Sequence, residues 1–451
     1  MQKSNAQAQT EEAIKQKAVA EQNAQEAAKQ KNNAEEQTKV AESEKSKAQK
    51  NATIAEEQRK KAEEEKKNAD KERTISNRLK ELAEAKNLAN QSILKFREGD
   101  KTKSKELALQ AYELNKKNDG PKQTSEIYTA LHTNWTNSIN NKNQATYHKF
   151  PVRVMEAKPN SNIVFTADES GALYVAKAEN GTLQTIGNPI QLKQDIRVLA
   201  SSKDGTKLFV ATANGNGFVF DISNTEAIKE TLKFTFNGIA KSIAVINNNQ
   251  FIVLTTNEIK RFTSDASTLM QGSIVRNNVV ALHLGNSGKI YLAADNKVLI
   301  YNSYDELIKN NAAQTYTVSS KLVSLAVSTT ENLLAAGTYD GSIWIRDQQQ
   351  NNSTTLALHK SSVNNLQLHQ LSNGNWQLAT AGADQTIKLI DVKEALNKIT
   401  QNVITLSEGG HTKWVYAVLY SNNGEHIYSC SEDKKIIGWK STMDALYKAL
   451  K

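Results

Sequence analysis

The chain has 451 residues, 38% of them hydrophobic, with 57 basic and 48 acidic side chains and a formal net charge of +9. Basic and acidic residues interleave along the whole length without a lysine or arginine block, which argues against a nucleic-acid-binding surface. A single cysteine, Cys430, excludes an internal disulfide and a cysteine-rich zinc site.

The chain contains no run of eighteen apolar residues, and its N-terminus lacks a basic segment followed by a hydrophobic core. We therefore expect a soluble, cytoplasmic chain without a membrane segment. Coding sequence upstream of Met1 for an effector domain or a membrane span would change that expectation.

Residues 1–98 contain neither glycine nor proline and are dominated by alanine, glutamate, lysine, glutamine and asparagine, which predicts one very long helix. Three interpretations are open: a solvated helix held by Glu/Lys pairs, a coiled-coil stalk that self-associates, and disorder. The coiled-coil interpretation depends on a strict seven-residue repeat of alanines, although the companion position is mostly polar. The repeat comprises Ala6, Ala13, Ala20, Ala27, Ala34, Ala41, Ala48, Ala55, Ala62 and Ala69.

Residues 75–140 change pattern and predict a small helical module that overlaps the end of the long helix. Gly99-Asp100 interrupts the helix, and Asp119-Gly120-Pro121 separates two further helical segments. The apolar positions expected to pack together are Ala83, Leu88, Leu107, Ala108, Ala111, Leu114, Ile127, Ala130, Leu131 and Trp135.

From Tyr147 the chain consists of short alternating segments separated by Asn, Asp and Gly turns. A turn residue recurs at intervals of 46, 43, 38, 45, 44 and 49 residues, and the series is Asp168, Asn214, Asn257, Asp295, Asp340, Asp384 and Asp433. Small sheets of this kind bury their faces when they are arranged radially. Seven such units therefore predict an all-β seven-bladed propeller over residues 143–440, preceded by an all-α region.

The stretch GGHTKWVYAVLYSNNGEHIYSCSEDKKIIGWK (residues 409–440) resembles the repeat unit of the WD-repeat β-propeller family. Gly410-His411, Ser429, Asp433 and Trp439 match that unit, and the sixth unit matches at His359, Thr380, Asp384 and Asp391, with Ile390 in place of the tryptophan. The resemblance implies that a strand within residues 143–150 completes the last blade, which leaves 441–451 as a C-terminal tail.

The preceding helical string LALQAYELN (residues 107–115) is similar to the helix pair found before the propeller in large bacterial WD-repeat signalling proteins. The third unit, near residues 239–262, has lost the signature residues and is placed only by its spacing and hydrophobic alternation.

His411, Ser429 and Asp433 are the residue types of a catalytic triad, but the resemblance implies that they form a buried network that fixes turns. The expected structural residues are His411, Ser429, Asp433, Trp439, His359, Thr380 and Asp384. Cys430 is expected to be a buried small residue. No nucleotide-binding or metal-binding motif occurs, so we predict no enzyme activity, catalytic residue, cofactor or metal site.

The resemblance also places one residue of each inner strand at one end of the central opening. In order, these are Arg153, Arg197, Lys241, Val280, Val323, Asn364 and Tyr416, with Trp414 beside the last. Arginine and aromatic residues commonly dominate binding energies. Two interpretations are open: an ordinary solvated surface without a ligand, and a site for an acidic peptide or phosphate-bearing partner. The residues of that site would be Arg153, Arg197, Lys241, Asn364, Trp414 and Tyr416.

The favoured interpretation is a non-enzymatic interaction scaffold or sensor, in which the long helix acts as a spacer or oligomeriser. Two alternatives are open: the C-terminal sensor part of a larger bacterial signalling or defence protein, as the resemblance suggests, and a structural coiled-coil rod. An enzyme would need acids or histidines clustered at the central opening, and the residues expected there include none.

Overall fold

The computed structural model describes residues 2–140, 142–247, 249–263, 278–372, 374–407 and 409–451. The chain divides into two compact units, Met1–Lys80 and Glu81–Lys451. None of the described helices combines the length and the apolar composition that crossing a membrane requires.

Helix α1 (Gln2–Arg97) is a single 96-residue helix, which confirms the long helix expected from the sequence. Within the first unit its described side chains are exposed to solvent. Ion pairs one turn apart support it, with 3.1 Å from Arg59 Nε to Glu63 Oε1 and 3.1 Å from Lys60 Nζ to Glu56 Oε1. The last part of α1, from Glu81 onward, belongs to the second unit.

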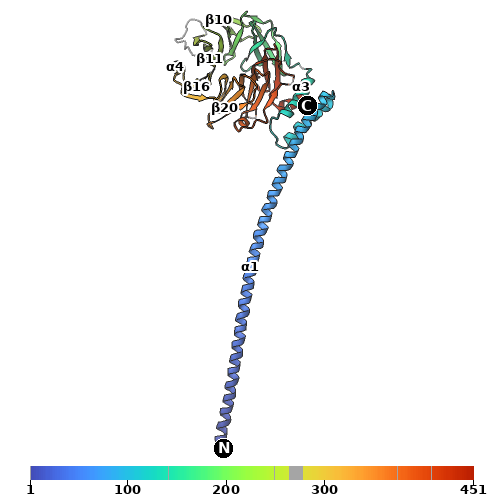
Figure 1. Cartoon of the computed structure of the whole chain (residues 1–451), viewed down its shortest axis with the longest axis vertical. Coiled ribbons are helices and arrows are strands. Elements are labelled where there is room, and N and C mark those ends of the chain that lie inside the picture. Colours follow the sequence, from blue (N-terminus) through green and yellow to red (C-terminus); the bar gives the residue numbers. More distant parts are fainter. Residues whose placement is uncertain (1, 141, 248, 264–277, 373, 408) are drawn as a thin grey trace. The chain divides into compact units, whose positions relative to one another are not determined.

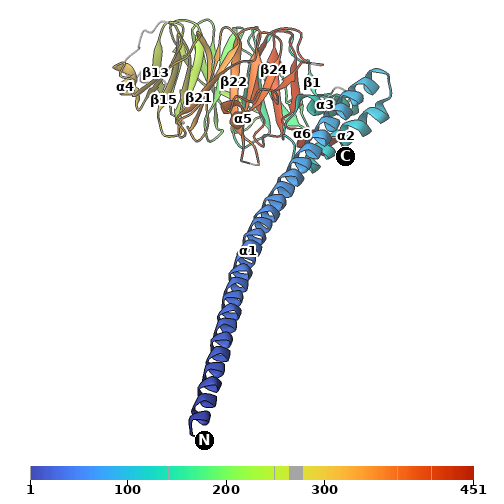
Figure 2. The ribbon, with the colours of Figure 1, turned by 60° about the horizontal axis from the view of Figure 1, so that its bottom comes forward.

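Three more helices accompany that end of α1: α2 (Lys101–Lys117), α3 (Ser125–Ser138) and α6 (Met443–Leu450). Each begins with a side-chain cap, since Asp100 accepts from the amide of Lys103, Thr124 from that of Ile127, and Thr442 from that of Ala445. These helices lie beside the last two blades (Figure 2). They bury a shared apolar cluster with these blades.

The segment expected as a C-terminal tail is therefore a packed helix. Met443, Leu446 and Leu450 of α6 recur at helical spacing and are 0–3% exposed. Tyr447 stacks on Tyr112 of α2 at 4.3 Å between ring centroids. The spacing of these apolar residues is typical of an amphipathic helix. The segment was expected to be a tail because it is too short for the pattern to be distinctive.

The rest of the second unit consists of seven antiparallel sheets, which confirms the seven-bladed propeller (Figure 1). Blade 1 contains β2 (Val152–Ala157), β3 (Ile163–Asp168), β4 (Ala172–Glu179), β5 (Thr182–Thr185) and β6 (Ile190–Gln191). Blade 2 contains β7 (Ile196–Ser201), β8 (Lys207–Thr212), β9 (Asn216–Asp221) and β10 (Lys229–Thr235). Blade 3, in its described part, contains β11 (Ala240–Asn247), β12 (Gln250–Thr255) and β13 (Ile259–Thr263).

The other four blades follow in chain order. Blade 4 contains β14 (Val279–Leu284), β15 (Ile290–Ala294), β16 (Lys297–Tyr301) and β17 (Gln314–Thr317). Blade 5 contains β18 (Leu322–Val327), β19 (Leu333–Thr338), β20 (Ser342–Asp347) and β21 (Asn352–Ala357). Blade 6 contains β22 (Val363–Gln370), β23 (Trp376–Gly382), β24 (Ile387–Asp391) and β25 (Ile404–Leu406). Blade 7 contains β26 (Val415–Tyr420), β27 (His426–Ser431), β28 (Ile436–Lys440) and β1 (Gln144–Ala145). The short helices α4 (Tyr304–Ile308) and α5 (Val392–Leu396) follow β16 and β24.

The blades form a closed ring because the inner strand of each blade contacts the inner strand of the next, and β26 of blade 7 contacts β2 of blade 1. The outer strand of blade 7 is β1, in which Gln144 pairs with Ile437 and Ala145 with Ile436. Residues from both ends of the propeller sequence therefore share one sheet. Neighbouring blades bury side chains between them, as where Phe209 of blade 2 lies 4.7 Å from Phe251 of blade 3.

Candidate functional site

His411, Ser429, Asp433 and Trp439 form one buried network in blade 7. The Nδ1 atom of His411 donates to Asp433 at 3.0 Å, and the Ser429 hydroxyl donates to Nε2 of His411 at 2.8 Å. Trp439 Nε1 donates to the Ser429 oxygen at 2.8 Å. Because Ser429 and Trp439 are 0–1% exposed, a substrate in solvent has no access to this hydroxyl.

The Asp433 carboxylate is held in its charged form. Burial alone would raise its pKa, but the hydrogen bond from His411 and those from two backbone amides lower it to about 2. One of those amides belongs to Lys435 in the turn that follows, at 3.0 Å. The network therefore fixes the turn between β27 and β28.

Blade 6 contains the same arrangement without the tryptophan. His359 Nδ1 donates to Asp384 at 3.0 Å, and Thr380 donates to His359 Nε2 at 2.7 Å. Thr386 also donates to Asp384 at 2.8 Å. Burial opposes this carboxylate's charge, yet the hydrogen bonds, led by that from His359, lower its pKa overall.

Blade 1 has a third network, centred on His148, that the sequence-based analysis missed. His148 Nδ1 donates to Asp168 at 2.9 Å, and Thr166 donates to Nε2 at 2.9 Å. The strand register places Ser170 at the turn position that Asp433 occupies in blade 7. The sequence-based assignment of Asp168 to this position is therefore wrong by two residues. The spacing of these residues could have predicted this network, because His148 precedes Thr166 by 18 residues and His411 precedes Ser429 by the same number.

Each of the seven inner strands contains a β-bulge at the residue expected to face one end of the central opening. In β2, for example, Val152 pairs with Asp168 and Val154 with Ala167, which leaves Arg153 outside the register. The equivalent residues form what we call the bulge ring: Arg153, Arg197, Lys241, Val280, Val323, Asn364 and Tyr416.

The end of the propeller that carries the bulge ring is called the bulge face. At this end the residue preceding each inner strand accepts a backbone hydrogen bond from the turn between the second and third strands. Examples are Glu432 N to Trp414 O at 3.1 Å and Tyr339 N to Lys321 O at 2.8 Å. Trp414 is 54% exposed and Tyr339 is 70% exposed, so aromatic surface at this face is open to solvent.

Two of the three cations of the bulge ring are ion-paired with carboxylates. Arg153 donates to Glu169 at 2.7 Å, and Arg197 lies 2.5 Å from Asp195. Burial raises the pKa of Asp195, and the charges of Arg197 and Arg153 oppose that rise. Within the described residues, Lys241 is the cation of the ring for which the structure shows no ion pair.

The aromatic and amide members of the bulge ring are held by their neighbours. The Arg153 guanidinium lies 4.5 Å above the Tyr416 ring, a cation–π contact between blades 1 and 7. The Asn364 side chain donates to the carbonyl of Val415 at 2.8 Å. The structure thus joins Arg153, Tyr416 and Asn364 into one preorganised arc, with exposed Trp414 beside it.

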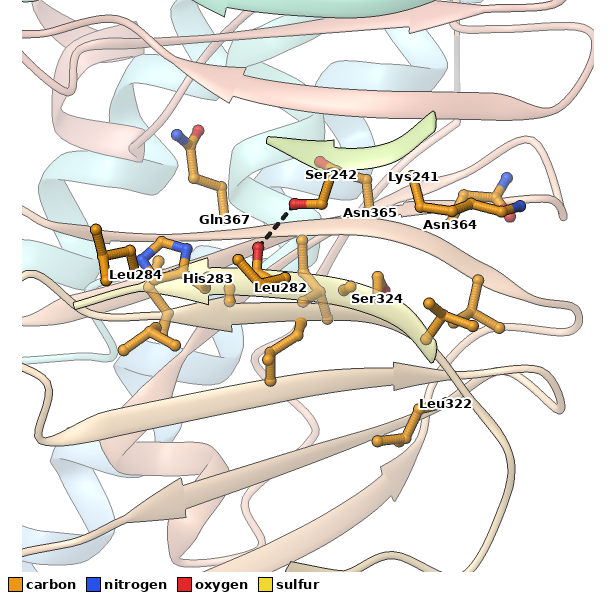
Figure 3. Close-up of a pocket in the computed structure, with 18 of the residues that line it drawn as sticks. Lys241, Ser242, Leu282, His283, Leu284, Leu322, Ser324, Asn364, Asn365 and Gln367 are labelled. Atoms are coloured by element: carbon orange, nitrogen blue, oxygen red, sulfur yellow. Dashed lines mark hydrogen bonds between the residues drawn. The ribbon is translucent and has the colours of Figure 1, made fainter. Parts of the chain in front are cut away.

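A cavity of about 710 Å³ lies along the inner strands of blades 3 to 6 (Figure 3). Lys241 and Asn364 lie toward one end of it and Leu284 toward the other. The walls carry small polar groups, and Ser242 donates to the carbonyl of Leu282 at 2.7 Å. The cavity therefore opens among residues of the bulge ring.

Cys430 is fully buried, and burial raises the pKa of its thiol. Within the described part of the chain, no three His, Cys, Asp or Glu side chains gather in a way that could hold a metal ion.

Comparison with known proteins identifies the repeat. A family model described as "WD domain, G-beta repeat" matches residues 350–391 and 401–440. The chain is also similar to the ribosome biogenesis protein YTM1 of Saccharomyces cerevisiae, with 25% identity over 344 residues in the sequences from strains YJM789 and S288c. The match covers 70% of this chain and 73% of the yeast protein.

Proposed function

We propose that this chain, a seven-bladed propeller with WD40 repeats, is a non-enzymatic interaction scaffold or sensor that binds a protein or peptide at its bulge face. The observation that carries the proposal is the exposed Trp414 beside the preorganised arc of Arg153, Tyr416 and Asn364. Such rigid aromatic and arginine groups are typical binding hot spots.

An acidic partner is favoured by the rim of the bulge face and not by the ring itself. Arg153 and Arg197 already pair with carboxylates, which leaves Lys241 as the ring cation without an ion pair among the described residues. Among the described residues, exposed lysines lie within three residues before the inner strands of five blades: Lys149, Lys193, Lys321, Lys360 and Lys413. We therefore propose a partner with an apolar or aromatic centre and acidic flanks, and no nucleic acid.

The similarity to the yeast ribosome biogenesis protein, over 70% of this chain, is compatible with a scaffold role. The helix pair similar to that of bacterial signalling proteins supports the alternative, a sensor attached to an effector. The single, fully buried thiol of Cys430 is compatible with a reducing compartment, and we propose the cytoplasm.

A peptide library displayed on phage tests the proposal. Selection against the full chain should enrich peptides with aromatic and acidic residues, and W414A should weaken the best peptide at least 10-fold, since removing an exposed hot-spot tryptophan costs about 2 kcal/mol or more. Trp414 is a cleaner target than Arg153, because reversing the charge of Arg153 would also break its pairs with Glu169 and Tyr416.

The matched control is K203E/K289E, which changes two exposed lysines in turns between first and second strands, at the opposite end of the blades. This variant should bind the peptide like the wild type. Equal binding by W414A, or a selection that yields no peptide, would reject recognition at the bulge face.

A further inference from the structure

Four exposed aliphatic side chains in the described first unit of α1 share one position of the seven-residue repeat, which holds polar or charged residues in its other heptads; this position is called the aliphatic column. Val19, Val40, Ile54 and Ile75 follow one another at 21, 14 and 21 residues, which are all multiples of seven. Each is 51–57% exposed. Aliphatic groups of this size gain about 1.5–3 kcal/mol each when they are buried, so their alignment indicates a covered face.

The period of this column requires a supercoil. A straight α-helix drifts by about 20° per heptad, so a strict seven-residue column winds around an isolated helix and faces no fixed direction. Two helices that coil around each other keep such a column in contact along its whole length. The heptad alanines, one per heptad from Ala6 to Ala69, follow the same period. A polar column that contains Gln16, Asn23 and Gln30 lies between the alanines and the aliphatic column.

We propose that α1 pairs with α1 of a second copy of this chain, in parallel and in register, along residues 12–80. This proposal goes beyond recognition at the bulge face. The propeller's recognition of a partner does not depend on it.

Charge decides the orientation. The column that follows the heptad alanines by four residues contains seven basic residues and no acid between residues 10 and 80: Lys17, Lys31, Lys45, Arg59, Lys66, Arg73 and Lys80. Two antiparallel copies would place this column against itself, and like charges would repel along the whole helix.

In the parallel arrangement each residue of the aliphatic column faces the basic column of the partner five residues further on. Glu12 then meets Lys17, Glu26 meets Lys31, and Val19 meets Ala24. Only one of these pairings, Lys61 with Lys66, brings like charges together between residues 12 and 80. These flanking pairings therefore favour a parallel over an antiparallel copy.

The available surface is large enough for a specific dimer. The heptads from Ala6 to Ala69 span roughly 95 Å at about 1.5 Å per residue. A contact stripe about 10 Å wide covers roughly 950 Å² on each copy, and the total falls in the range of about 1,200–2,000 Å² of stable interfaces.

Cysteine crosslinking of the full chain tests the proposal, because the native Cys430 is fully buried. The variant A34C places a thiol in the seam, where parallel, in-register copies bring it against itself. S46C places one on the opposite side of the helix. Under mild oxidation A34C should form a disulfide-linked dimer and S46C should not. Antiparallel copies would instead crosslink in a mixture of A13C and A62C, and that result would overturn the proposal.

Sedimentation of matched variants provides the second measurement. V40K/I54K should raise the dimer dissociation constant about 100-fold or more, because it removes two large aliphatic groups from the interface. S46K/T53K introduces the same residues on the opposite side and should leave the dimer intact. A wild type that sediments as a monomer, or equal behaviour of the two variants, would overturn the proposal. Peptide binding per propeller should be the same in both variants, so failure of the dimer is distinguishable from failure of recognition.

Discussion

At the scale of single residues, the polar groups that resemble a catalytic triad are buried and satisfied by one another. Ser429 is shared between His411 and Trp439, and both of its partners are themselves buried. A nucleophile requires an exposed hydroxyl and donors directed at a developing oxyanion, and this network provides neither within the described blade.

Three histidines give the protein a predicted pH dependence. Burial lowers the pKa values of His132, His283 and His426 to about 4, from an unfolded value of about 6.5. The unfolded state therefore binds protons first, and the free energy of unfolding falls as the pH drops from about 6.5 toward 4. At pH 5 the loss should be about 2 kcal/mol for each histidine.

The variant H132F measures the contribution of His132 to this loss of unfolding free energy. His132 lies 5.1 Å from the Trp439 ring, and its Nδ1 atom has no hydrogen-bond partner, so phenylalanine preserves the stacking and removes the titration. Urea unfolding at pH 7 and pH 5, followed by tryptophan fluorescence, should show a smaller loss for H132F by about 2 kcal/mol. An identical loss in both proteins would mean that His132 is not held neutral in the folded state.

Residue-level prediction from the sequence succeeds where spacing is informative. The repeat period identifies the residue of each inner strand that is bulged in the structure, from Arg153 to Tyr416. It does not identify their carboxylate partners: Glu169 reaches Arg153 only when β2 and β3 pair, and Asp195, although two residues from Arg197, shows no pairing in the repeat pattern alone. The expected charge of the bulge ring was therefore too positive.

At the scale of elements, α6 shows how the C-terminal segment secures the helices to the propeller. Its Tyr447 stacks on Tyr112, and the Tyr112 hydroxyl donates to Asp444 at 2.6 Å. Leu446 is fully buried in the cluster that α2 and α3 share with blades 6 and 7. The helix is thus part of the core and not an appendage.

Two substitutions within α6 separate packing from surface effects. L446A should destabilise the protein by about 2–5 kcal/mol, the usual range for a fully buried leucine. K448A, two residues further on, removes an exposed side chain and should change stability by less than about 0.5 kcal/mol. Thermal unfolding of the full-length variants measures both, and equal stabilities would show that α6 is not packed as described.

The helices and strands that could be predicted from the sequence are those whose residue patterns extend over many residues. The absence of glycine and proline predicted α1, and the period near forty-five residues predicted seven sheets even where blade 3 keeps only its hydrophobic alternation. A two-residue strand such as β1 has no periodicity of its own. Its place beside β28 depends on closing the ring, which is a property of the tertiary structure.

At the scale of the whole molecule, each unit offers one proposed surface for association. The second unit presents the bulge face, with Trp414 and Tyr339 open to solvent. The first unit presents the aliphatic column of α1, with Val19 and Ile54 more than half exposed. The two proposals involve different residues, so the binding of a partner and the pairing of copies can be measured independently.

Hydrogen–deuterium exchange of the full chain, with and without the selected peptide, tests recognition by the bulge face most directly. Binding at the bulge face should slow exchange where the inner strands of several blades begin, around Arg153, Arg197, Lys241, Asn364 and Trp414. The turns that contain Lys203 and Lys289, at the opposite end, should exchange at unchanged rates. Protection confined to those opposite turns, or to the helices α2, α3 and α6, would show that the peptide does not bind at the bulge face.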